Sequence, residues 1–151
     1  MKNVFEIRRL TDDFYKDYPV ALFPEIERKN NRPYAVLLIK IEKLTFAIPL
    51  RTNIHHSSCY KFKTSDRKTN STTGLDFSKA VVISKNKYIG DKTVINNKEY
   101  IELQRKSFFI RNKFKKYIMD YLDVLKGTAN KFIIKRYRYS TLKYFDKFFI
   151  C

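Results

Sequence analysis

The chain has 151 residues, 44% of them hydrophobic and only 3 glycine and 4 proline, so composition excludes a disordered tail, a linker and a low-complexity segment. Its 32 lysines and arginines outnumber 15 acidic residues, and the net charge of +17 favours a polyanionic partner, namely nucleic acid, anionic lipid or an acidic protein. No apolar run approaches the roughly 20 residues that cross a bilayer, and no signal peptide is recognisable, so we expect one cytosolic domain over residues 1–151.

The first elements in chain order are a strand and a short helix. Residues 4–10 alternate between apolar and polar side chains, which predicts a strand. Thr11 and the two aspartates after it form an N-cap region, which predicts a helix over residues 12–17 that ends before Pro19. Residues 23–28 predict one more helical turn, because Pro24 suits a first helical position.

A β-hairpin is predicted next. Residues 34–41 form a continuous apolar strand, Glu42 and Lys43 form the turn, and residues 44–50 form the return strand. Pro49 has no amide hydrogen, so strand pairing is expected to stop near it.

The middle of the chain predicts short strands separated by a basic loop. Residues 57–73 are polar and basic, with a short strand possible at 59–62, and residues 80–83 are a buried strand. Residues 88–95 predict a small hairpin or a sheet edge around Gly90.

The last third predicts helices. Apolar residues from Leu103 to Leu125 follow helical spacing, which predicts one long amphipathic helix over residues 99–126, and Gly127 suits its C-cap. The basic, aromatic tail, residues 128–150, predicts one or two further helices, and its tyrosines 137 and 139 suit either packing on the long helix or stacking on bases. Strands followed by helices make the predicted class α+β.

Metal and nucleotide chemistry is poorly supported, so no cofactor is expected. The chain has no His-x-x-x-His or Cys-x-x-Cys pair, no carboxylate cluster and no phosphate-binding glycine-rich loop. A nucleophilic Cys59 acting with His55 or His56 is a weak alternative, because the sequence shows no acid that would orient either histidine.

A basic protein can cleave RNA without metal, because RNA supplies the 2′-hydroxyl as nucleophile. Such a protein needs groups that move protons and cations that stabilise the phosphorane. Residues of these types follow the apolar strand that ends at Leu50, and further cations lie elsewhere in the chain. The candidates for proton transfer or hydrogen bonding are Thr52, Asn53, His55 and His56. The candidates for binding phosphate are Arg32, Arg51 and Lys79.

Three segments resemble the toxins of type III toxin–antitoxin systems, the ToxN-like endoribonucleases with their AbiQ, CptN and TenpN relatives. The first is RPYAVLLIKIEKLTFAIPLRT, a basic residue, a strand, a turn and a strand ending in Pro-Leu with a hydroxyl two residues later. The second is GLDFSKAVVI at residues 74–83, and the third is Phe-Ile-Arg at residues 109–111. Their order and spacing carry the resemblance, which is strongest to the CptN and TenpN groups.

The resemblance implies a compact, strongly bent, mostly antiparallel sheet carrying helices. It implies metal-independent, sequence-selective cleavage of RNA to a 2′,3′-cyclic phosphate and a 5′-hydroxyl. It also implies an RNA antitoxin, made as a pseudoknotted tandem repeat, that the toxin processes and then holds in a closed protein–RNA assembly. Free toxin would cut messenger RNA in the bacterial cytoplasm, and such systems can serve phage defence.

The resemblance also assigns site residues. Thr52 matches the key hydroxyl, Arg32 a position usually held by lysine, and Lys79 the basic residue ahead of the third strand. Tyr15 is matched to an aromatic residue near the N-terminus, for which Phe14 and Tyr18 are alternatives.

The chain departs from the family where some members follow the hydroxyl with Pro-Lys. Here residues 53–56 are Asn-Ile-His-His, so the role of that lysine is expected to pass to a histidine or to another residue. His55 or His56 is favoured, because an unperturbed histidine side chain titrates near neutral pH. Further RNA contacts are expected from basic and polar residues beside the site, in the 61–68 loop and in the tail: Arg51, Asn53, Lys61, Lys63, Arg67, Lys68, Arg136 and Arg138.

Two other functions share the charge and the aromatic content. A non-catalytic RNA-binding module would bind RNA without cleaving it, and a binder of membrane surfaces or acidic proteins would hold no nucleic acid. The fold class alone does not distinguish the three.

Overall fold

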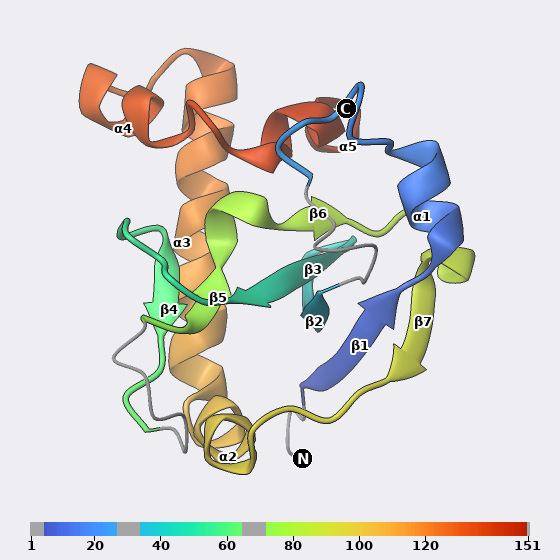
Figure 1. Ribbon diagram of the computed structural model, residues 1–151. Coiled ribbons are helices and arrows are strands. Elements are labelled where there is room, and N and C mark those ends of the chain that lie inside the picture. Colours follow the sequence, from blue (N-terminus) through green and yellow to red (C-terminus); the bar gives the residue numbers. More distant parts are fainter. Residues whose placement is uncertain (1–4, 27–33, 65–71, 151) are drawn as a thin grey trace.

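The computed structural model describes residues 5–26, 34–64 and 72–150. These residues form an α+β fold, as predicted, in which a seven-stranded antiparallel sheet carries helices (Figure 1). The strands are β1 (Glu6–Leu10), β2 (Ala35–Ile41), β3 (Leu44–Arg51), β4 (Cys59–Lys61), β5 (Gly74–Asp76), β6 (Val81–Val82) and β7 (Ile89–Lys92). The α-helices are α1 (Asp12–Asp17), α2 (Asn97–Arg105), α3 (Ser107–Lys126), α4 (Lys131–Arg136) and α5 (Asp146–Phe149), and the 3-10 helices are η1 (Phe77–Lys79), η2 (Asn86–Tyr88) and η3 (Thr141–Phe145).

The β2–β3 hairpin is the centre of the sheet, whose strand order is β4-β5-β3-β2-β1-β7, with β6 also paired to β3. Pairing of β2 with β3 runs from Ile41 opposite Leu44 to Val36 opposite Pro49 and stops there, as predicted. Beyond Pro49, β3 changes partner, and Leu50 pairs with Leu75 of β5. The change of partner carries the end of β3 away from β2 toward β5 (Figure 1).

The prediction of one long helix over residues 99–126 is wrong in one respect. The helix is interrupted at Lys106, which separates α2 from α3. Figure 1 shows α2 nearly end-on beside the foot of α3, so the two helices point in different directions. The Asn96 side chain caps α2, and the buried side of α2 contains Glu99 and Glu102 besides Leu103. Glu102 bonds to Tyr60, a tertiary contact that helical periodicity does not encode.

Helix α3 covers one side of the sheet through an aromatic core. Phe114 packs edge-on against Phe46 of β3 and Phe77 of η1, with ring centroids 5.2 Å apart in both pairs. The Tyr137 ring is tilted against that of Tyr117, with centroids 4.8 Å apart, and the Tyr137 hydroxyl donates to the Tyr117 carbonyl. Tyr137 therefore packs on the long helix, whereas Tyr139 is 63% exposed.

Of the other predicted elements, some are confirmed and some differ in the structure. Helix α1 has the predicted bounds, and Gly127 ends α3 with φ +77°, as a left-handed C-cap. Residues 23–26 form turns rather than a helix, and the strand predicted at 80–83 is only the two residues of β6, because the Ala80 amide bonds back to Phe77. The region around Gly90 is the edge strand β7, paired with β1.

Replacing Gly74 with alanine is expected to destabilise the fold by about 3 kcal/mol, because steric overpacking against backbone is hard to relieve. A Cβ there would lie 2.0 Å from the Tyr60 carbonyl oxygen of β4. Gly127→Ala is the matched control, because its Cβ would meet open space and only the positive φ would cost about 1–2 kcal/mol. Urea unfolding measures both, and equal losses would contradict the close β4–β5 approach.

Candidate functional site

A small pocket lies where β3 ends, and it brings together three of the residues proposed from the sequence. Its volume is about 30 Å³, and apolar side chains of β1, β2, β3 and β6 form its floor. Tyr15 from α1, Arg51 from β3 and Lys79 from η1 line it together. The lining thus combines an aromatic residue with two cations, and cationic side chains are the groups that bind phosphate.

Asp76 and Tyr34 both contact Arg51 in this pocket. Its Nη1 donates to Oδ2 of Asp76 at 3.2 Å, and its guanidinium lies 5.7 Å from the ring centroid of Tyr34. A guanidinium is a planar fork of N–H donors, and the contact with Asp76 orients that plane.

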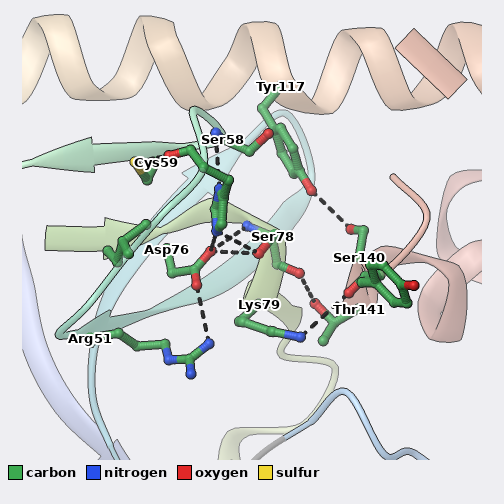
Figure 2. Close-up of polar contacts among 12 residues, drawn as sticks. Arg51, Ser58, Cys59, Asp76, Ser78, Lys79, Tyr117, Ser140 and Thr141 are labelled. Atoms are coloured by element: carbon green, nitrogen blue, oxygen red, sulfur yellow. Dashed lines mark hydrogen bonds and ion pairs between the residues drawn. The ribbon is translucent and has the colours of Figure 1, made fainter. Parts of the chain in front are cut away.

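Asp76 is the hub of the site, and its side chain is only 3% exposed (Figure 2). Besides Arg51, its carboxylate accepts from the Ser78 amide at 3.0 Å and the Ser78 hydroxyl at 2.6 Å, and it lies 3.1 Å from Nε2 of His56. The Ser78 amide bond makes Asp76 the N-cap of η1, so one carboxylate fixes the end of β5, Arg51 of β3 and the loop that carries His56.

The expectation that neither histidine has an orienting acid is wrong for His56, because Asp76 provides one. Nδ1 of His56 accepts from the Ser58 amide at 3.1 Å, so the neutral ring carries its hydrogen on Nε2 and donates it toward Asp76. The Ser78 hydroxyl, 3.3 Å away, also faces Nε2. In a Ser-His-Asp triad the acid and the nucleophile bind opposite nitrogens, so this is not a triad.

Both ring nitrogens of His56 have polar partners, Ser58 and Asp76, so the side chain is suited to holding these segments in place. It ties the segment after β3 to β5. The ring is 41% exposed and remains within reach of a ligand.

The remaining polar residues after β3 are exposed, and they flank the buried residue Ile54. Ile54 is buried, its amide donates to the Thr72 carbonyl, and its own carbonyl accepts from the Thr72 hydroxyl at 2.7 Å. Thr52, Asn53 and His55 are exposed on either side of it. Asn53 has φ +55°, the left-handed conformation in which asparagine is better tolerated than most residues.

Lys79 is positioned by the C-terminal segment. Its Nζ lies 3.5 Å from the Tyr139 carbonyl, and the Thr141 hydroxyl donates to the Ala80 carbonyl beside it. Arg138 lies over the exposed Tyr139 ring at 5.3 Å. The basic tail therefore borders the pocket through residues 138–141.

Cys59 is a structural thiol. It is buried, and its Sγ donates to the His56 carbonyl at 3.2 Å. Burial raises the pKa of this thiol, which disfavours the thiolate that a nucleophile requires. The Cys-His alternative thus loses its main support.

The proposed RNA contacts fall into three groups. Lys61 and Lys63 are exposed at the end of β4, where Glu102 accepts from the Lys63 and Thr64 amides. Arg136 and Arg138 are exposed in the tail, on either side of Tyr137. Two further RNA contacts, Arg67 and Lys68, lie outside the described residues, as does Arg32, the candidate from the catalytic set.

Glu102 fixes the start of the basic loop. Burial raises its pKa, but hydrogen bonds from Tyr60, Thr64 and the Lys63 amide outweigh burial and leave the pKa below its usual value. Above acidic pH, Glu102 is therefore charged in the folded protein.

Sequence reasoning missed Asp76, Ser78 and Tyr34. Asp76 and Ser78 lie within the second segment that resembles the toxins, but residue type and spacing assigned no role to them. The available signal was a lone acid between Leu75 and Phe77, followed by a serine at the spacing of a helix cap.

Among the described residues, no group of three or more His, Cys, Asp or Glu side chains is arranged to hold a metal ion. Within the same residues, no helix is both long and apolar enough to cross a membrane. Comparison with known proteins gave no match, whether to protein-family models, to curated proteins or to solved structures.

Proposed function

We propose that the chain is a metal-independent endoribonuclease of the type III toxin class. The observation that carries the proposal is the pocket at the end of β3, where Tyr15, Arg51 and Lys79 meet and where buried Asp76 fixes both Arg51 and His56. Thr52, the hydroxyl indicated by the resemblance, follows Arg51 directly.

The proposed reaction is an in-line transesterification of RNA. The 2′-oxygen forms a bond to phosphorus, the bond from phosphorus to the 5′-oxygen breaks, and the products are a 2′,3′-cyclic phosphate and a 5′-hydroxyl. The 2′-hydroxyl proton passes to a base, and an acid protonates the leaving oxygen. Arg51 and Lys79 hold the non-bridging oxygens and stabilise the charge of the phosphorane.

Proton transfer is assigned to the exposed His55 and the partly buried Tyr15. His55 is exposed, and an imidazole can both accept and donate a proton, whereas both nitrogens of His56 are engaged. Tyr15 lines the pocket and is the second candidate. Thr52 orients the ribose or the phosphate with its hydroxyl, and His56 positions the segment that carries it.

The proposal extends to the partners that the resemblance implies. A repeat RNA antitoxin would occupy the same site in a closed protein–RNA assembly, and cellular messenger RNA would be the substrate of the free toxin in the bacterial cytoplasm. Bound RNA would neutralise much of the +17 net charge.

The test is incubation of RNA-stripped protein with mixed-sequence RNA in EDTA, followed by analysis of the product ends. Wild type is expected to leave cyclic phosphates, and Thr52→Ala is expected to cleave about a hundredfold more slowly, as for loss of one transition-state donor. His55→Gln and His56→Gln, assayed beside it across pH, separate the proton carrier from the positioning residue.

The alternatives give different results in the same preparation. Tight RNA binding without cleavage, from a folded protein, would support a non-catalytic RNA-binding module. Purified protein whose ultraviolet absorbance shows no bound nucleic acid, and which binds anionic vesicles instead, would support the membrane-surface alternative.

A further inference from the structure

A second cavity lies between α3, α4 and the loop before β4. Its volume is about 130 Å³, and two tyrosines and a phenylalanine form its apolar wall. The polar lining consists of two serines from the loop, three cations and one acid: Ser57, Ser58, Lys113, Lys116, Arg136 and Asp120.

The charge of this second pocket suits an anion. Its one carboxylate, Asp120, already accepts from Lys116 at 2.6 Å, one turn away on the same helix. Three cations and one carboxylate leave two net positive charges, and Lys113 and Arg136 are exposed at the opening. Serine hydroxyls beside guanidinium and ammonium groups are the donors that recur around phosphate oxygens.

A chain of contacts links a residue of each pocket. The Ser58 amide donates to Nδ1 of His56, Nε2 of His56 faces Asp76, and Asp76 accepts from Arg51. One imidazole and one carboxylate therefore lie between Ser58 of the second pocket and Arg51 of the first. Figure 2 shows Ser58 on one side of Asp76, toward Tyr117 and α3, and Arg51 and Lys79 on the other.

We propose that the second pocket binds a backbone phosphate of the same RNA strand whose scissile phosphate lies between Arg51 and Lys79. This proposal rests on the proposed function. It adds the direction of the bound RNA, because the strand would cross the exposed edge of His56 from α3 and α4 toward α1. Binding energy gained at this neighbouring phosphate would hold the reacting phosphate in register without touching it.

The experiment compares two double variants with the same change of charge. Lys113→Gln/Arg136→Gln removes one cation from α3 and one from α4 inside the pocket. Lys126→Gln/Lys135→Gln removes one exposed cation from each of the same helices outside its lining. The probe is a short single-stranded oligodeoxynucleotide, which lacks the 2′-hydroxyl and so cannot be cleaved by transesterification, and binding is read by fluorescence anisotropy.

The pocket pair is expected to bind the oligodeoxynucleotide about tenfold more weakly than wild type, as for the loss of charge-assisted contacts, and the control pair less than about threefold. Equal weakening by both pairs, or no weakening by the pocket pair, would overturn the proposal. Thermal unfolding of both variants establishes that they are folded.

A cleavage arm separates this proposal from the proposed function. With RNA longer than the scissile dinucleotide, the pocket pair is expected to raise KM, and to raise it more than it does for a dinucleotide. If wild type cleaves no RNA, the proposed function fails while the oligodeoxynucleotide result still decides the second pocket. If the pocket pair slows dinucleotide cleavage as much as cleavage of the longer RNA, the second pocket is not a separate phosphate site.

Discussion

Replacing Asp76 with asparagine is expected to lower the free energy of unfolding by about 3 kcal/mol and the rate of RNA cleavage by about a thousandfold. The carboxylate accepts four contacts, from Arg51, His56 and two Ser78 donors, and an asparagine would turn its NH2 group toward one of these donors. Stability falls because a buried cation contact and an N-cap are weakened together.

The loss of cleavage has two sources. Releasing Arg51 costs the oriented cation on the phosphorane, about a hundredfold. Releasing His56 loosens the segment that carries Thr52, which adds about tenfold through misplacement of the reacting groups. Asp76 itself touches no reacting atom in this scheme and acts as a positioning residue.

Urea unfolding and product-end analysis measure the two effects separately, with cleavage assayed at a temperature where the variant is folded. Asp91→Asn is the control, because Asp91 is exposed on β7 and its replacement removes the same charge. Asp76→Glu, which keeps the charge, is expected to recover part of the cleavage. A folded Asp76→Asn protein with full cleavage would show that Arg51 needs no carboxylate and would remove Asp76 from the site.

Elements set by local chemistry were predictable from the sequence. Helix α1, the β2–β3 hairpin and the glycine cap of α3 each depend on residues a few positions apart. The break at Lys106 was not predictable, because apolar spacing continues from Leu103 to Ile110 across it. Helix α2 is distinguished by Glu102, whose partners Tyr60 and Thr64 lie about forty residues earlier and meet it only in the folded chain.

The candidate site was predictable to a similar extent. The cationic side chains and Thr52 could be identified from residue type and from the order of segments in the resemblance. The contacts of Asp76 beyond Ser78 could not, because these partners come from β3 and the His56 loop, which meet through the three-residue strands β4 and β5. Strands this short leave almost no periodic pattern in a sequence.

Raising the salt concentration fourfold is expected to weaken RNA binding about a hundredfold, because each phosphate contact releases counterions. The two pockets offer about five cations to a single strand: Arg51, Lys79, Lys113, Lys116 and Arg136. About five contacts on single-stranded RNA correspond to a slope near −3.5 in a plot of log affinity against log salt. Binding titrations at several salt concentrations, with non-cleavable RNA, measure this slope.

The slope also tests how the charge is organised. If the +17 net charge acts as a diffuse field, all double lysine or arginine variants should change the slope alike, whatever their position. If binding runs through the two pockets, Lys113→Gln/Arg136→Gln should reduce the slope by about 1.4, two contacts' worth, and Lys126→Gln/Lys135→Gln should leave it nearly unchanged. A slope near zero for wild type would contradict phosphate recognition altogether, since burial of bases alone releases few counterions and would leave the excess of cations without a role in binding.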